Sequence, residues 1–402
     1  MTIAAKVTAP LGAEGPRTPA WIAGRIEDFV ALRHEFHAAP ELAFHEVQTS
    51  ARIAELLTRW GYQVRRLART GIVATLENGD GPALAIRADI DALPITETTG
   101  LPFASTNAGV MHACGHDGHM AILLAAAHHL SLTRRFRGTL RLIFQPAEEI
   151  GAGAKALIEA GLFRDQPVDA IFGLHNWPGV AAGHFGFVEG PAMAAVDKVE
   201  AVIRGRGGHG AEPHLAIDPV VAAAHAVTAL QTVVARNTDP RETAVVTVAS
   251  IHGGAASNVI PDRVELALTL RSFSDAVRDR LRDRVPAIID GVSASLGAAA
   301  DVVLTPGFPS VVNSVEETRL IRRVAVERFG AAAVLEGFAP RTASEDFAFY
   351  LHHRPGSFVF VGNGDGPALH SPDYRFNDDI IGPAAALWVA LAERFLTGGA
   401  DA

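Results

Sequence analysis

The segment His112–His119 holds three histidines and Cys114, the only cysteine among the 402 residues. Cys114 and His116 are two positions apart, and in a loop this spacing directs both side chains to the same side. Gly115 and Gly118 favour a loop here, because glycine adopts turn conformations at little steric cost. A thiolate and an imidazole that converge in this way form half of a transition-metal site. A buried cysteine can also be a simple apolar residue, so the metal hypothesis requires further ligands elsewhere.

Three other places in the sequence supply such ligands, and each follows an apolar segment of strand length. In chain order they are Glu148-Glu149, His175 and His370. Ligands of open α/β sheets gather beyond the carboxyl ends of the strands, so residues that are distant in sequence can meet there. We therefore predict a metal site at this edge of a sheet.

The adjacent carboxylates Glu148 and Glu149 could divide two tasks between them. Neighbouring residues of an extended chain point to opposite sides, so one can hold a metal ion while the other faces a substrate. Hydrolysis at a metal needs both a ligand and a carboxylate that moves a proton from water to the leaving group. The residues alone leave open which glutamate has which task, and a solvated acidic turn before Gly151 is the alternative.

A charge count adds to this interpretation. One thiolate and one glutamate contribute two negative charges, whereas neutral histidines contribute none. A pair of divalent cations would leave the site positive, which favours an anionic substrate group and stabilises an oxyanion.

The composition limits the possible partners and the location. The length predicts two domains, and the hydrophobic share of 49% suffices for a large core. The net charge of −9, with both signs interspersed, argues against a nucleic acid or an anionic membrane surface as partner. No apolar run approaches the about 20 residues of a membrane span. We expect a cytoplasmic protein, because residues 1–20 form a flexible leader without the apolar core of a signal peptide and a lone cysteine suits a reducing compartment.

Helical and strand patterns alternate through the first half of the chain. Periodicity predicts helices over 47–60 and 120–130, and apolar runs predict strands over 72–76, 83–86, 140–144 and 170–174. This alternation is typical of an α/β sheet with helices on its faces.

A different pattern occupies residues 193–307. Strands are predicted over 199–203, 244–250, 264–270 and 302–304, with helices over 218–235 and 274–296. The order β-α-β-β-α-β is that of a ferredoxin-like α+β unit. The α/β pattern then resumes with a strand over 357–361 and a helix over 380–396. We predict an α/β domain of residues 21–192 and 308–402, interrupted by the unit 193–307.

The motifs of the whole chain resemble those of one family, the M20 metallopeptidase and aminoacylase group. The similarity is to its amidohydrolase branch, which contains hippurate hydrolases, N-acyl-amino-acid amidohydrolases and auxin-conjugate hydrolases. Segments that match the family are found nearly from end to end. They are 33–37, 40–42, 87–94, 112–119, 144–149, 173–178, 205–209, 257–261, 345–347 and 369–371.

This resemblance implies a di-metal catalytic domain, with a mixed sheet flanked by helices, and an inserted lid and dimerisation domain. It implies a homodimer or homotetramer formed through that lid. It also assigns roles by residue. The implied metal ligands are Cys114, His116, Glu149, His175 and His370.

The resemblance further implies that Glu148 is the general base. His209 of the lid would stabilise the oxyanion in a neighbouring subunit's site, with a simple loop histidine as the alternative. Asn258 and Arg271 would bind the substrate carboxylate, and a planar guanidinium suits that group.

Four residues near the predicted ligands have less direct roles. Asp89 and Asp91 follow a strand and are expected to orient a ligating histidine. His112 and His119 are alternative ligands, since His119 lies one helical turn beyond His116 and could compete with it.

The resemblance implies hydrolysis of the amide bond of N-acyl amino acids, such as N-acetyl or benzoyl conjugates, to a carboxylic acid and a free amino acid. A dipeptidase or an N-carbamoyl amino acid hydrolase on the same scaffold is the alternative. A cysteine hydrolase with Cys114 as nucleophile and a non-catalytic binding protein are the other classes considered. Mixed sulfur, nitrogen and oxygen ligands admit two ions of Mn, Zn, Co or Ni.

Overall fold

The computed structural model describes residues 20–397, which form two compact units. The first unit comprises the described residues up to Gly190, then Val312–Ala339 and the chain from Asp346 onward. The second comprises Pro191–Val311 and Pro340–Glu345. The predicted leader, residues 1–20, lies outside the described residues except for Ala20. Among the described helices, none is long and apolar enough to cross a membrane.

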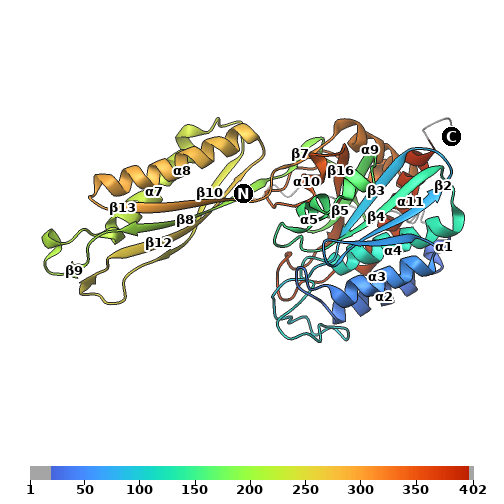
Figure 1. Ribbon diagram of the computed structural model, residues 1–402, viewed down its shortest axis with the longest axis horizontal. Helices are drawn as coiled ribbons and strands as arrows, with labels where there is room; N and C mark the ends of the chain where they lie inside the picture. Colours follow the sequence, from blue (N-terminus) through green and yellow to red (C-terminus); the bar gives the residue numbers. More distant parts are fainter. Residues whose placement is uncertain (1–19, 398–402) are drawn as a thin grey trace. The chain divides into compact units, whose positions relative to one another are not determined.

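An eight-stranded sheet forms the centre of the first unit (Figure 1). Its central strands β4, β3, β5 and β16 run parallel to one another, and β6 runs parallel to β15. The pairs β1–β2, β2–β4 and β16–β6 are antiparallel, so the sheet is mixed as expected. In spatial order the strands are β1 (Gln63–Leu67), β2 (Gly71–Asn78), β4 (Gly138–Gln145), β3 (Ala83–Asp89), β5 (Ala170–Pro178), β16 (Gly356–Gly364), β6 (Phe185–Gly186) and β15 (Val334–Leu335).

Helices cover this sheet, and α4 contacts α2, α3 and α11. The α-helices of the first unit are α1 (Ala20–Ala23), α2 (Ile26–Ala38), α3 (Val47–Arg59), α4 (His116–Thr133), α5 (Gly153–Glu159), α6 (Leu162–Asp165), α9 (Val315–Phe329), α10 (Ala348–Leu351) and α11 (Ile381–Leu396). The helices predicted over 47–60 and 380–396 agree with α3 and α11 to within a residue. The sequence analysis missed α2, whose buried face contains Arg33 and His37 and therefore lacks a plain apolar period.

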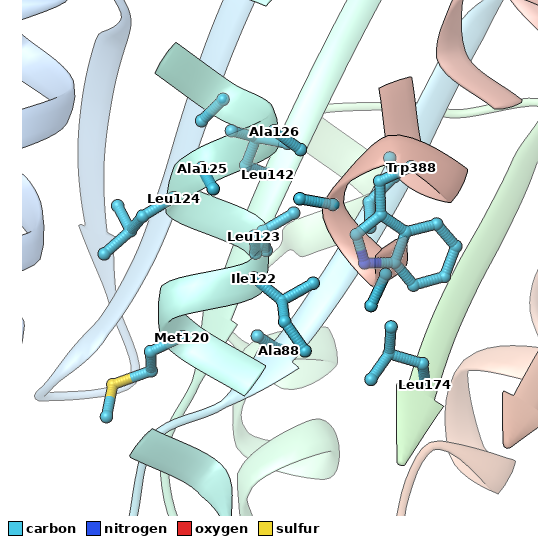
Figure 2. Packing of buried hydrophobic residues seen from close by; sticks show 14 of the residues in the cluster. Ala88, Met120, Ile122, Leu123, Leu124, Ala125, Ala126, Leu142, Leu174 and Trp388 are labelled. Atoms are coloured by element: carbon cyan, nitrogen blue, oxygen red, sulfur yellow. The ribbon is translucent and has the colours of Figure 1, made fainter. Parts of the chain in front are cut away.

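Helix α4 is the centre of the core. It begins at His116 rather than at residue 120, and its residues from His116 to Ala127 are all buried. Figure 2 shows its apolar side chains in one cluster with strand residues such as Leu142 and Leu174 and with the indole of Trp388 on α11. A helix that is apolar on every side is stable only when it is enclosed in this way. Its first turn is thereby fixed at the carboxyl ends of the parallel strands.

The second unit is an antiparallel sheet with two helices. The elements follow one another as β8 (Ala195–Arg204), α7 (Pro219–Asn237), β10 (Ala244–His252), β12 (Arg263–Ser272), α8 (Asp275–Ser295) and β13 (Ala299–Pro306). The sheet order is β10-β12-β8-β13, and α7 and α8 contact each other and the sheet (Figure 1). A small ribbon pairs β9 (Gly208–His209) with β11 (Val259–Ile260). Side chains of Asp218 and Ser274 cap the two helices by accepting backbone N–H bonds.

The second unit begins and ends within a few residues of the predicted 193–307, and it contains one further segment. Pro340–Glu345, which the sequence analysis assigned to the α/β domain, belongs to the second unit. Hydrogen bonds explain this, because Arg271 Nη1 donates to Thr342 O at 2.8 Å and Ala194 N donates to Ala343 O at 3.0 Å. Strands β7 (Gly190–Met193) and β14 (Val311–Asn313) lie where the chain passes from one unit to the other.

Candidate metal centre

Five predicted ligands come together in the first unit as two groups that share Cys114. The first group is Cys114, His116 and His175, and the second is Cys114, Glu149 and His370. Within each group the possible ligand atoms lie within 4.8 Å of one another. Ligands of one cation at bond lengths of about 2.0–2.3 Å lie at such separations. The five residues are drawn from four distant parts of the chain, as the strand-end argument predicts.

A backbone turn presents Cys114 and His116 together. Gly115 has a φ of 89°, and a Cβ at this position would lie 2.6 Å from Asn176 Oδ1. Only glycine fits this conformation and this space. The loop predicted for the whole motif is correct for Cys114, but His116 already stands in the first turn of α4. Cys114 Sγ lies 3.3 Å from His175 Nε2.

Hydrogen bonds fix which ring nitrogen of two histidines is free to bind a metal. His116 Nδ1 lies 2.8 Å from the carbonyl oxygen of Asp91, and His175 Nδ1 lies 2.6 Å from that of Asn176. A carbonyl oxygen only accepts, so Nδ1 carries a proton in both rings and Nε2 is the nitrogen left for a metal. Burial also holds the pKa of His175 well below its usual range, which keeps this ring neutral. Both imidazoles are thus prepared as Nε2 ligands.

Two buried atoms show that a cation fits this donor set. Among the described residues, His116 Nε2 and Glu149 Oε1 have no hydrogen-bond partner, and 3.8 Å separates them. A buried polar atom without a partner is costly, and a coordinated cation removes that cost. Thiolate, imidazole and carboxylate ligands together suit borderline divalent metals such as zinc.

The electrostatics of the centre favour positive charge. Burial raises the pKa of Glu149 to about 7, an effect that His116 opposes and that the carboxylates of Asp91 and Asp89 reinforce. Burial disfavours the charged form of His116, but Asp89, Asp91 and Glu149 outweigh it and raise its pKa to about 10. The buried carboxylates therefore stabilise a proton on the imidazole, and a metal ion would compete with that proton for Nε2.

Glu148 lies at the edge of this centre and is buried with 6% of its surface exposed. Its carboxylate falls within 4.8 Å of ligand atoms of His116 and Glu149. The extended backbone expected for the glutamate pair was wrong, because Gly151 N donates to Glu148 O at 2.7 Å and closes a turn. The pair therefore lies in a turn, with both carboxylates near His116.

Asp89 and Asp91 contact histidines of the centre, and Asp89, His116 and His119 form a further group of possible ligand atoms within 4.8 Å of one another. Asp89 Oδ2 is 3.6 Å from His116 Nε2, and Asp89 Oδ1 is 2.7 Å from His119 Nδ1. Asp91 holds the His116 ring through its carbonyl oxygen, and its carboxylate accepts the Glu149 N–H at 3.0 Å. Asp91 therefore orients two members of the centre.

The alternative ligands His112 and His119 differ in their surroundings. Both ring nitrogens of His119 are engaged, since Nδ1 contacts Asp89 and Nε2 accepts the Asn176 N–H at 3.1 Å. His112 is buried, and burial lowers its pKa to about 4. His112 belongs to none of the ligand groups that the described residues form.

His370 completes the second group from the chain after β16. It has a φ of 65°, and its N–H donates to Ala113 O at 2.8 Å, one residue before Cys114. Its Nε2 lies 3.5 Å from Glu149 Oε2. Its side chain is half exposed, so this group lies at the open side of the centre.

The three predicted lid residues belong to the second unit. His209 and Asn258 are exposed. His209 lies in β9 opposite Val259, and Asn258 directly precedes β11 and accepts the Gly210 N–H at 2.8 Å. Arg271 lies on β12, and its Nη1 donates to Thr342 O and to Ser344 Oγ.

One functional contact was missed by the sequence analysis. Arg87 is fully buried in β3 and donates to Asp89 Oδ2 at 2.7 Å and to Asp346 Oδ1 at 3.1 Å. It therefore fixes the carboxylate that faces His116 and His119. An arginine inside an otherwise apolar strand was the available signal, because such a charge must be paired.

Comparison with known proteins agrees with this geometry. Residues 85–394 match the model of peptidase family M20/M25/M40. The chain is 42% identical over 373 residues to N-acetyl-L-cysteine deacetylase of Bacillus subtilis, covering 92% of this chain and 88% of that protein. It is 37% identical over 371 residues to hippurate hydrolase of Campylobacter jejuni, covering 92% and 97%.

A solved structure is similar over almost the whole chain. It is the YXEP protein of Bacillus subtilis, described as a dinuclear metal binding peptidase of the M20 family. Its TM-score is 0.80 at 36% identity, with 93% of this chain and 99% of that chain covered. Together with the family match, these relatives show that the chain belongs to peptidase family M20/M25/M40.

Proposed function

We propose that this protein is a metal-dependent amidohydrolase that cleaves N-acyl amino acids to a carboxylic acid and a free amino acid. One observation carries the proposal: two ligand groups share Cys114, and the carboxylate of Glu148 lies beside them. A centre built only to bind a ligand would need no such carboxylate. The names of the relatives support the substrate class, because N-acetylcysteine and hippurate (N-benzoylglycine) are both N-acyl amino acids.

Two divalent cations fit the residues of the centre. Cys114, His116 and His175 would hold one ion, and Cys114, Glu149 and His370 the other. Such ions supply Lewis acidity and lower the pKa of a nearby water. The two anionic ligands do not neutralise a total charge of four, so the centre would attract an anionic substrate. Mn, Zn, Co and Ni all suit this donor set.

Glu148 is proposed as the proton carrier. It would accept a proton from the attacking water and deliver it to the leaving nitrogen of the amide. Its carboxylate lies within 4.8 Å of that of Glu149, and Glu149 is the one that faces His370. We assign the ligand role to Glu149 because it also belongs to the group with Cys114 and His370.

The second unit is proposed to act as a lid and dimerisation domain. Its exposed His209 and Asn258 are proposed to meet substrate, with His209 stabilising the oxyanion and Asn258 binding the carboxylate together with Arg271. A homodimer or homotetramer formed through this unit is part of the same proposal.

Metal removal and reloading test the proposed function. The chelated protein is expected to lose hydrolysis of N-acetyl and N-benzoyl amino acids and to regain it with Mn, Zn, Co or Ni. Dipeptides and N-carbamoyl amino acids belong in the same panel, because faster cleavage of either would favour the alternative on this scaffold. Inactivation by thiol alkylation without any effect of chelation would instead favour a cysteine hydrolase.

Glu148→Gln separates proton transfer from metal binding. We expect kcat to fall by about 100-fold or more, because general acid–base catalysis contributes about 10²–10⁴-fold. Metal analysis should find the content unchanged. Glu149→Gln is the matched variant, and it should lose metal as well as activity. A near-normal rate of Glu148→Gln would refute the role of Glu148.

A further inference from the structure

Glu46 is a fully buried carboxylate that none of the proposed steps uses. It stands at the N-terminal end of α3, yet its side chain does not cap that helix. Instead, Oε1 accepts the N–H groups of Phe44 and Ala147, each at 3.0 Å, and Oε2 accepts the Thr70 hydroxyl at 2.5 Å. A buried carboxylate with this many donors is a fixed anchor.

Ala147 is the partner that matters, because it directly precedes Glu148. Its φ is 52°, in the left-handed region that residues other than glycine rarely adopt. Its own carbonyl accepts the N–H groups of Ala152 and Gly153, each at 3.1 Å. Such a conformation persists only when the surroundings determine it, and these bonds hold the residue on both sides.

A second carboxylate holds the other side of the glutamate pair. Asp91 Oδ2 accepts the Glu149 N–H at 3.0 Å. The backbone N–H before Glu148 and the one after it are therefore each bound by a buried carboxylate, Glu46 and Asp91. Asp91 also contacts His116, whereas the hydrogen bond that links Glu46 to the glutamate pair runs through the Ala147 backbone.

We propose that Glu46 is a positioning residue for amide hydrolysis: its carboxylate holds the Ala147 N–H and so fixes the turn that presents Glu148. This inference rests on the proposed function, in which Glu148 carries the proton. Without the anchor, Ala147 relaxes to an ordinary conformation and the Glu148 carboxylate leaves its position. The metal ligands keep their own contacts.

The test compares Glu46→Ala with Glu41→Ala. Glu41 is the matched control, because it accepts the N–H groups of Gln48 and Thr49 at the start of the same helix. We expect Glu46→Ala to lower kcat about 10- to 100-fold, the range found for residues that orient active groups, with KM and metal content nearly unchanged. Glu41→Ala should lower the melting temperature but leave kcat unaltered. Equal kcat losses in the two variants, in proportion to their lost stability, would overturn the inference.

Two additional variants sharpen the comparison. Glu46→Gln retains an acceptor of the same length and should restore most of kcat. Ala147→Gly in the Glu46→Ala background should recover part of kcat, since glycine adopts a positive φ without strain.

If Glu46→Ala does not fold, Glu46→Gln and Glu46→Asp replace it. The shorter side chain should then show the lower kcat, and equal kcat values would contradict the proposal.

Hydrogen exchange gives a readout that does not depend on activity. Amides of 147–153 should exchange faster in Glu46→Ala than in the wild type and in Glu41→Ala. Unchanged exchange in this segment would refute the anchor even where kcat falls. A wild-type protein that hydrolyses no N-acyl amino acid would refute the proposed function instead, while the exchange experiment would still test the anchor.

Discussion

Two buried clusters of charged side chains, one in each unit, differ in whether their charges are paired. In the second unit Asp197 is bound by Arg278 and Arg282, with four N–O distances between 2.7 and 3.0 Å, and by Gly307 N at 3.0 Å. The metal centre of the first unit gathers Cys114, histidines and Glu149, and leaves His116 Nε2 and Glu149 Oε1 without a hydrogen-bond partner among the described residues.

The two clusters shift pKa values in opposite directions. Burial alone would raise the pKa of Asp197, but the two guanidinium groups outweigh it and lower the pKa to about 2. At the metal centre burial and neighbouring carboxylates raise the pKa of Glu149 to about 7. In a closed buried ion pair each charge depends on its partner, so the loss of one partner is destabilising. An excess of buried ligands without a balancing cation instead indicates a place for a bound one. The predictions below test this distinction.

Cys114→Ala should have the largest effect. Cys114 belongs to both ligand groups, so its loss weakens both positions. We expect metal affinity to fall by more than the about 10- to 100-fold that is typical of residues behind the ligands, with activity lost in parallel. Metal analysis after dialysis measures this. Full metal content in the variant would mean that Cys114 is not a ligand. The contrast between the two clusters would then lose its basis.

The sequence anticipates the centre because several of its ligands lie near the carboxyl ends of strands. His175 was expected to follow a strand but lies within β5, near its end, and Glu149 comes shortly after β4, so the α/β alternation brings them to one edge. The fold class follows from the same alternation. The rest depends on tertiary contacts: the left-handed Ala147, the buried Arg33 that disguises α2, and the segment Pro340–Glu345 that joins the second unit. None of these leaves a periodic signal, since each is stabilised by groups far along the chain.

Asp197→Asn tests the closed cluster. The change keeps the shape of the side chain but leaves Arg278 buried without a balancing charge. Breaking a buried pair in this way costs about 3–5 kcal/mol. We expect a lower melting temperature and faster hydrogen exchange in β8 and α8, while metal content and KM stay unchanged. Loss of metal from this variant would mean that the two clusters are not independent.

Acid titration should separate the two clusters. The lowered pKa of Asp197 contributes stability that is fully present above the ordinary pKa of about 3.9 and is lost as the pH falls through about 2. The contribution is about 2.6 kcal/mol at most. The pKa of Glu149 is raised rather than lowered. Its protonation therefore begins near neutral pH, and from there downward protons compete with the metal for this carboxylate. Metal should therefore leave before the second unit loses stability. Metal analysis and exchange at stepped pH measure both, and the reverse order would contradict the contrast.

Substitutions of Asp218 should have the smallest effect on stability, and Asp218→Asn is the control for the loss of charge in Asp197→Asn. It caps α7 by accepting Val220 N at 2.8 Å and Val221 N at 3.3 Å, at an exposed position. Asp218→Ala should cost about 1 kcal/mol in thermal or urea unfolding, because these backbone donors can turn to water. Asp218→Asn should cost almost nothing, since asparagine caps a helix as well as aspartate does. The same replacement at Asp197 removes the charge on which two arginines depend. Asp197→Asn could instead destabilise the protein as little as Asp218→Asn does. The Asp197 cluster would then be held by hydrogen bonds alone, and pairing with arginine would no longer distinguish it from the metal ligands.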